Sequence, residues 1–214
     1  MTQIDPYNPL DLQALGHSLL LELERRPTTP LKALSKFVGS GIYGLYYTGS
    51  AKPYAQLGKF NQQHGCLLPL YVGRSKDTGA RQGLDPFEPV KKALLYGRVQ
   101  EHRRNVEAAA GIQAGDFVVR TLVAMPIWIP LAEAMAIRVY RPVWNSSLQG
   151  FGIHAPGSGR AMQKQSDWDL LHPGRAFAKA LPKSAVRTRE ELLARTEKAA
   201  RESIDRFRKL RSYR

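Results

Sequence analysis

The stretch Gly41-Ile-Tyr-Gly-Leu-Tyr-Tyr47 is followed further along the chain by Leu67-Leu-Pro-Leu-Tyr-Val-Gly73. Both runs are rich in aromatic and β-branched residues and are bounded by glycine, proline or serine, so we predict two short strands. A glycine beside each tyrosine lets backbone or a ligand come close to the phenol. Two such strands alone are typical of a hydrophobic hairpin at the rim of a core, so a functional interpretation depends on the residues that follow.

Two polar residues on a predicted helix come next. The pattern from about residue 89 to residue 110 is helical, and Arg98 and His102 project from one face because they are four positions apart. Residues 116–125 then alternate in polarity and predict a third strand. The chain therefore places a basic, hydrogen-bonding helix face directly after the tyrosine strands.

Glu133 is the only acid in a second apolar helix, which is predicted to open at Pro130 and to end at Arg141-Pro142. A carboxylate in such surroundings is costly unless it is paired or bound to a metal. A salt bridge to Arg138 or another cation is therefore the structural alternative to a metal site. Asn145 follows in a loop, where its carboxamide either bonds to local backbone or supports a site.

The charge of the chain favours a polyanionic partner. The net charge is +14 and the pI is about 10.1, which fits nucleic acid or an acidic membrane surface. The longest apolar run, residues 123–137, contains two prolines and Glu133, which argues against a membrane span. Cys66 is the single cysteine, so no disulfide framework or cysteine-based zinc site is predicted. With no secretory signal pattern at the N-terminus, we expect a cytoplasmic nucleic-acid-binding protein.

In this order, the motifs resemble the GIY-YIG nuclease superfamily. Gly41-Ile42-Tyr43 is similar to the first half of its signature, and Tyr71-Val72-Gly73 is similar to the second half with valine in place of isoleucine. The resemblance covers about residues 38–150 and is closest to the Type II restriction endonuclease branch. It implies a mixed α/β (α+β) fold with a small, central, antiparallel three-stranded sheet flanked by helices. The two triplets usually lie closer together, so residues 48–68 look like an insertion.

The same resemblance implies a role for each site residue. Glu133 would be the one protein ligand of a Mg²⁺ or Mn²⁺ ion, and Arg98 would hold the scissile phosphate. Tyr43 would accept the proton of the attacking water, with its pKa lowered by Arg98 and the metal, and His102 would accept the Tyr43 hydrogen bond. Tyr71 would bond to the water or to a phosphate oxygen, and Asn145 would buttress the site. The full catalytic set is Tyr43, Tyr71, Arg98, His102, Glu133 and Asn145.

Two polar insertions, residues 48–68 and 74–92, are candidates for DNA contact. Loops this long in compact domains are usually functional or disordered. Lysine, arginine, asparagine and glutamine can hold phosphates or read base edges, although a solvated polar loop is the equal alternative. The candidate DNA-binding residues are Lys52, Lys59, Asn61, Gln62, Arg74, Arg81, Lys91, Lys92, Arg103 and Arg104.

Helical extensions are predicted on both sides of the 38–150 core, within one compact domain. Residues 1–37 predict an apolar helix that starts near Asn8-Pro9 and a second short helix from Thr29-Pro30 to about residue 37. Residues 151–214 predict a glycine-rich loop and a long basic helix that begins with a capping box at Thr188 and Glu191. The apolar N-terminal helices and the apolar stripe from Leu193 to Phe207 are the candidate dimer interfaces.

We therefore predict a Type II restriction endonuclease that acts on double-stranded DNA. Resemblance to a small dimeric subgroup suggests a GC-rich palindrome such as CCGCGG, a homodimer on DNA, and a cognate DNA methyltransferase in the same cell. The alternatives are a structure-specific or homing nuclease with the same core, and a basic DNA-binding protein without catalysis.

Overall fold

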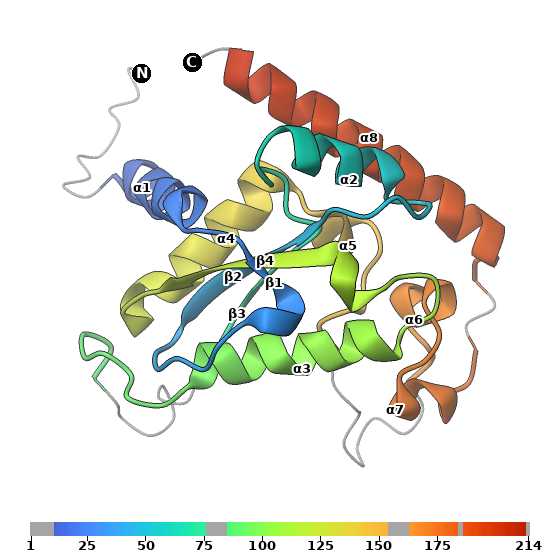
Figure 1. Ribbon diagram of the computed structural model, residues 1–214, viewed down its shortest axis with the longest axis horizontal. Helices are drawn as coiled ribbons and strands as arrows, with labels where there is room; N and C mark the ends of the chain where they lie inside the picture. Colours follow the sequence, from blue (N-terminus) through green and yellow to red (C-terminus); the bar gives the residue numbers. More distant parts are fainter. Residues whose placement is uncertain (1–10, 76–84, 154–162, 184–185, 213–214) are drawn as a thin grey trace, which may run out of the picture.

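A central antiparallel sheet organises the chain in the computed structural model, which describes residues 11–75, 85–153, 163–183 and 186–212 (Figure 1). Its strand order is β1-β4-β2-β3, with β2 (Gly41–Tyr47) paired to β3 (Tyr71–Arg74) and to β4 (Phe117–Val123). Every residue of β2 is buried, because other strands cover both of its edges and helices cover its faces. The predicted antiparallel sheet is confirmed, and a strand forms within each of the three predicted runs, although residues 67–70 precede β3.

The expected count of three strands is wrong, because the described residues form four. β1 (Thr29–Pro30) pairs with Val118 and Val119 of β4 and stands at the edge of the sheet. A 3₁₀ turn, η1 (Leu31–Ala33), follows it, so the helix predicted from residue 29 to about 37 does not form. Pro30 is compatible with an edge strand because its missing N–H is not needed there, and the fully buried Leu31 anchors the turn.

Helices lie on opposite faces of the sheet (Figure 1). Strand alternation directs Tyr43 toward α3 (Leu94–Ala108), where its ring meets His102. Ile42 faces the other way and packs in a cluster with α4 (Ile129–Tyr140) and α1 (Leu12–Arg25). The two predicted helices that carry the polar site residues therefore flank the tyrosine strands from two sides.

The insertion between β2 and β3 is a helix rather than a loop. α2 (Ala55–Gln63) buries Leu57 and Phe60, and a Cβ atom at Gly58 would lie 2.0 Å from the carbonyl oxygen of Gly49. The Asn61 side chain is fully buried and bonds to backbone groups of Tyr47 and Leu68. This insertion belongs to the hydrophobic core.

The C-terminal residues fold back onto the core. They form α5 (Val143–Ser146), α6 (Asp167–Leu171), α7 (Ala176–Lys179) and α8 (Arg189–Ser212), which runs alongside α2 (Figure 1). The predicted capping box is confirmed: the Thr188 N–H donates to Glu191 Oε2 at 2.8 Å, and the Glu191 N–H donates to Thr188 Oγ1 at 3.2 Å. Leu192, Ile204 and Phe207 are buried against the same chain, so this stripe of α8 is a core surface and the suggestion that it forms a dimer interface is wrong.

α1 is only partly covered within the chain, since Leu12 and Leu21 are exposed. Asp11 caps it by accepting from the Gln13 N–H, and Leu20 and Leu23 are buried where α1 packs on α4. The predicted start near Asn8-Pro9 lies outside the described residues. Two further 3₁₀ turns, η2 (Ala114–Asp116) and η3 (Pro126–Trp128), connect the larger elements. None of the described helices combines the length and the apolar character needed to cross a membrane.

Candidate active site

Two tyrosines meet at the β2–β3 edge of the sheet. The strand register pairs Tyr43 with Gly73 and Leu45 with Tyr71, so both phenols lie on the same face. Their ring centroids are 6.1 Å apart. A Cβ atom at residue 73 would lie 2.6 Å from the Tyr43 hydroxyl oxygen, so only glycine lets this ring lie across β3. The second triplet therefore contributes a phenol and the space that the first phenol needs.

α3 brings Arg98 and His102 to this pair. The buried His102 ring lies 5.8 Å from the Tyr43 ring and 5.2 Å from the Tyr71 ring. The Tyr43 hydroxyl makes no hydrogen bond within the described residues, so the predicted bond from Tyr43 to His102 is absent there, and the two rings meet in a tilted contact with an interplanar angle of 41°. His102 thus packs against both phenols.

The Arg98 guanidinium is held by two elements. It donates from Nη1 to Glu101 Oε2 at 2.9 Å and from Nη2 to the Gly152 carbonyl at 3.2 Å. Its side chain is 11 % exposed, which leaves it in contact with solvent at the margin of the tyrosine cluster.

Burial dominates the acidity of the two phenols. It raises the pKa of Tyr43 well above 10, Tyr71 adds to the rise, and Arg98 opposes it. Burial also raises the pKa of Tyr71, against the charge and hydrogen bond of Arg98. In the protein by itself, desolvation of the Tyr43 phenolate therefore outweighs the charge of Arg98, and the expected lowering of this pKa by Arg98 together with a metal stays a prediction.

Glu133 reaches the site from α4. Its Oε2 lies 2.9 Å from Nε of Arg74, at the end of β3, with side-chain exposures of 26 % and 33 %. Glu133 also raises the pKa of both tyrosines, which shows that its charge acts on the same cluster. The salt bridge that the sequence left open is present, with Arg74 rather than Arg138 as the partner.

Asn145 supports the outer edge of β3. Its Oδ1 accepts from the Val72 N–H at 2.8 Å, and its Nδ2 donates to the Val72 carbonyl at 2.8 Å. The carboxamide therefore replaces a neighbouring strand at an otherwise open edge. This contact is tertiary, between α5 and β3, rather than the local loop bond that was the alternative.

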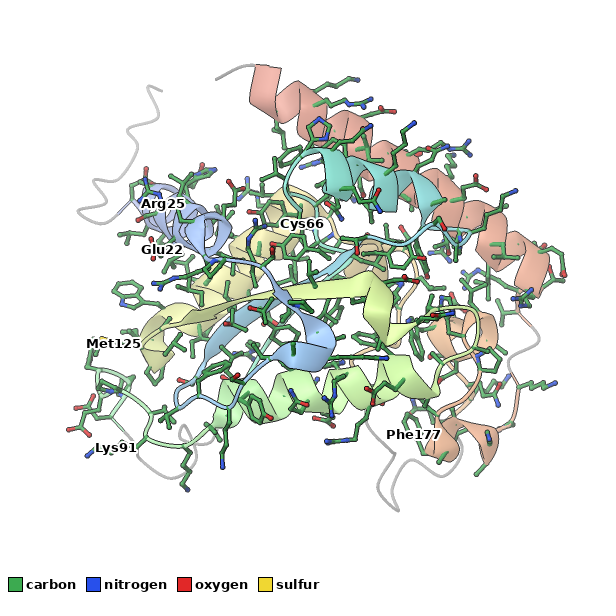
Figure 2. All side chains as sticks on the ribbon, in the orientation of Figure 1. Glu22, Arg25, Cys66, Lys91, Met125 and Phe177 are labelled. Carbon is green, nitrogen blue, oxygen red and sulfur yellow. The ribbon has the colours of Figure 1, made fainter. Side chains whose placement is uncertain are left out.

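The predicted DNA-binding residues are scattered. Asn61 is buried and satisfied, so its assignment to base contact is wrong; Gln62 is exposed but bonds to the Thr48 carbonyl, and Arg74 pairs with Glu133. Arg103 pairs with Glu107 at 3.6 Å, and Arg81 lies outside the described residues. Four lysines and one arginine remain on the surface: Lys52, Lys59, Lys91 (Figure 2), Lys92 and Arg104.

Sequence reasoning missed three residues that touch the site. Glu101 binds Arg98, Phe151 packs 4.4 Å from the His102 ring, and Gly152 supplies the carbonyl for Arg98. Glu101 could have been found from its i, i+3 spacing to Arg98. Phe151 and Gly152 had no such signal, because only tertiary packing brings their segment beside α3.

The site offers one carboxylate, that of Glu133, as a ligand for a divalent metal ion. The described residues contain no cluster of three histidines, cysteines or acids that could hold a metal. A single carboxylate suits Mg²⁺, which keeps most of its water ligands. Glu133 is partly exposed, so it fits as that carboxylate, and its pair with Arg74 is the competing structural role.

Comparison with known proteins gives one family. A model described as the Eco29kI GIY-YIG domain matches residues 35–202 of the 214. No curated protein sequence matches the chain. The matched range holds both triplets and every predicted catalytic residue, and the family uses divalent metal ions. The chain therefore belongs to the Eco29kI GIY-YIG family of Type II restriction endonucleases, as its motifs predicted.

Proposed function

We propose that the chain cuts both strands of a short DNA palindrome as a Mg²⁺-dependent homodimer. Family membership makes it a site-specific endonuclease of double-stranded DNA. The observation that carries the finer proposal is the convergence of two phenols and Arg98 at one sheet edge, within reach of the Glu133 charge. Phosphodiester hydrolysis needs such a grouping of proton acceptor, cation and metal ligand.

Arg98 is proposed to bind the scissile phosphate. A planar guanidinium can hold two phosphate oxygens at once, which a lysine ammonium cannot do. Glu101 and Gly152 fix the plane of the Arg98 guanidinium before DNA binds. The side chain therefore loses little conformational freedom when it binds a phosphate. The charge would then oppose the negative charge that grows on the phosphate in the transition state.

Tyr43 is proposed to accept the proton of the attacking water. Its raised pKa keeps it protonated in the protein by itself, so added positive charge must make the phenolate accessible. A divalent ion at Glu133 would supply that charge, and would neutralise charge on the leaving oxygen. Tyr71 is also buried but contacts Arg98, and it is proposed to bond to the water or to a phosphate oxygen. Asn145 is proposed to keep β3 in place through its two hydrogen bonds to Val72.

Surface cations are proposed to follow the DNA backbone. Lys52, Lys59, Lys91, Lys92 and Arg104 are exposed, which suits sequence-independent phosphate contacts. Arg103 is a further candidate for DNA contact. So is Arg81, in the part of the second insertion that lies outside the described residues. Such contacts would position the chain, whereas base contacts would select its target.

Dimerisation is proposed because one site cuts one strand, while a palindrome presents two equivalent half-sites. The stripe of α8 is buried in its own chain, whereas Leu12 and Leu21 of α1 are exposed, so α1 remains a candidate for the contact. A GC-rich palindrome such as CCGCGG is the proposed target. A methyltransferase that modifies that target would protect the host DNA.

Plasmid digestion tests this proposal. The purified chain, with Mg²⁺, should give discrete bands whose ends map to one palindrome, and EDTA should abolish them. Sedimentation with the cognate duplex should give two chains per duplex. Nicking at junctions or flaps would favour a structure-specific nuclease, and retention of uncut DNA would favour a non-catalytic DNA-binding protein.

A further inference from the structure

Arg175 is a buried arginine outside the predicted catalytic set. Its side chain is 1 % exposed and forms a fork with Asp169, from Nε to Oδ1 and from Nη2 to Oδ2, both at 2.7 Å. The guanidinium carbon lies over two aromatic rings, 4.7 Å from the centre of Trp168 and 4.8 Å from that of Phe177, which Figure 2 labels on α7. A buried arginine held by a carboxylate fork and two aromatic rings has one well-defined position.

The same guanidinium binds the segment 150–153. It donates to the carbonyls of Phe151 at 3.0 Å, Ile153 at 3.1 Å and Gly150 at 3.0 Å. These residues have no regular secondary structure of their own, and Gly150 has φ +116, where a side chain would be strained. Arg175 therefore supplies hydrogen bonds that a helix or sheet would otherwise provide.

The remaining residue of that segment faces the active site. The Gly152 carbonyl accepts from Arg98 Nη2 at 3.2 Å, and a Cβ atom at Gly152 would stand 2.7 Å from the Tyr71 hydroxyl oxygen. The Phe151 ring packs 4.9 Å from the Tyr71 ring and 4.4 Å from the His102 ring. Any displacement of the segment would thus reach three proposed catalytic residues.

We propose that Arg175 is a positioning residue: by holding the carbonyls of residues 150, 151 and 153, it fixes the Gly152 carbonyl and so orients the Arg98 guanidinium. The inference rests on the proposed function, in which Arg98 binds the scissile phosphate. Lysine cannot replace this arginine, because an ammonium group cannot satisfy a carboxylate fork and three carbonyls in one plane. Arg175→Lys keeps the charge and releases the segment.

A double-mutant cycle tests the route through Arg98. In single turnover with saturating DNA, Arg175→Lys should lower the cleavage rate about 10–10²-fold, as expected for a misplaced catalytic group. In an Arg98→Lys background, which lacks the guanidinium to be oriented, the same change should cost about twofold or less. Equal losses in both backgrounds would mean that Arg175 only supports the fold and would overturn the proposal.

Arg187→Lys is the matched control. Arg187 also pairs with an aspartate of α6, Asp167, at 2.8 Å, but it is 40 % exposed and makes no described contact with residues 150–153. The Arg187→Lys variant should cleave DNA at the wild-type rate. If Arg175→Lys does not fold, Asp169→Asn, which keeps the shape and weakens the fork, should show the same dependence on Arg98.

A readout without catalysis separates this inference from the proposed function. In ¹⁵N NMR of the arginine side chains, the Arg98 Nη signals should be sharp and distinct in the wild type, because rotation of the held group is slow. In Arg175→Lys they should merge, while those of Arg120, which donates to Gly65 and Arg26 carbonyls, should not change. Unchanged Arg98 signals would overturn the inference. A wild type that cuts no DNA but passes this test would overturn only the proposed function.

Discussion

Gly73 lies opposite Tyr43 in the β2–β3 ladder, so close that a Cβ atom at residue 73 would be 2.6 Å from the Tyr43 hydroxyl oxygen. The same added atom would be 2.8 Å from the Tyr71 ring. One glycine therefore makes room for both phenols, and the close approach explains how two separate triplets form a single site.

Tyr43→Phe keeps this packing and removes only the hydroxyl. It should bind DNA like the wild type and cut about 10²–10⁴-fold more slowly, the usual cost of losing a general base. Tyr46→Phe is the matched control, because Tyr46 is equally buried on the other face of β2. Single-turnover rates should separate the two variants. Near-normal cutting by Tyr43→Phe would transfer the base role to Tyr71 or to another group.

The cleavage rate should rise with pH well beyond neutrality. Burial raises the pKa of Tyr43 above 10, and the active form is the phenolate, so each pH unit below the pKa costs about tenfold in active enzyme. We expect the single-turnover rate to climb from about pH 7 to 9 without a plateau. A plateau by pH 8 would indicate either that another group with a lower pKa accepts the proton, or that bound DNA and metal strongly lower the pKa of Tyr43.

Glu133→Gln should remove cleavage and spare both DNA binding and folding. Loss of a metal ligand is expected to cost about 10²-fold or more in rate, since metal catalysis supplies several kcal/mol. The pair with Arg74 is partly exposed, so its loss should change the free energy of unfolding by about 1 kcal/mol or less. Titration calorimetry of Mg²⁺ into the protein–DNA complex should show lost binding. The exposed Glu88→Gln is the charge control; a stable Glu133→Gln that cuts normally would make the residue a salt-bridge partner alone.

Truncation after Lys183 should prevent folding. It would remove α8, whose Leu192, Ile204 and Phe207 are buried in the core. Burial of each such side chain contributes about 1.5–3 kcal/mol, and the sum is comparable to a total stability of about 5–15 kcal/mol. Circular dichroism should show lost cooperative melting. A truncated chain that melts normally would show that α8 is only an attached arm.

His172 should make the fold sensitive to mild acid. Burial lowers its pKa from 6.5 to about 4, and the ring bonds to the Tyr54 hydroxyl and the Ala110 carbonyl. Below pH 6.5 the unfolded chain binds a proton at this histidine that the folded chain does not bind. The free energy of unfolding therefore decreases as the pH is lowered from 6.5 to about 4, by about 2 kcal/mol at pH 5. Urea unfolding at pH 7 and pH 5 should show this loss, and His172→Gln should show a smaller one. An equal loss in both would assign the acid sensitivity to other groups.

The local sequence pattern was sufficient to predict most of the secondary structure around the site and the family of this protein. Alternating strands, the i, i+4 pair of Arg98 and His102, and the capping box at Thr188 are set by backbone periodicity and hydrogen bonding between near neighbours. These features predicted the elements around β2, α3, β4, α4 and α8. The paired triplets and the order of the polar residues predicted the family.

Only the tertiary structure decided which polar groups are buried and what they contact. Asn61 and Gln62 are adjacent and chemically alike, yet Asn61 serves the backbone of two other segments while Gln62 is exposed. The partners of Glu133 and Asn145, and the segment that Arg175 holds, lie far away in sequence. The high pKa of Tyr43 has the same origin, since desolvation depends on everything packed around the phenol and not on its neighbours along the chain.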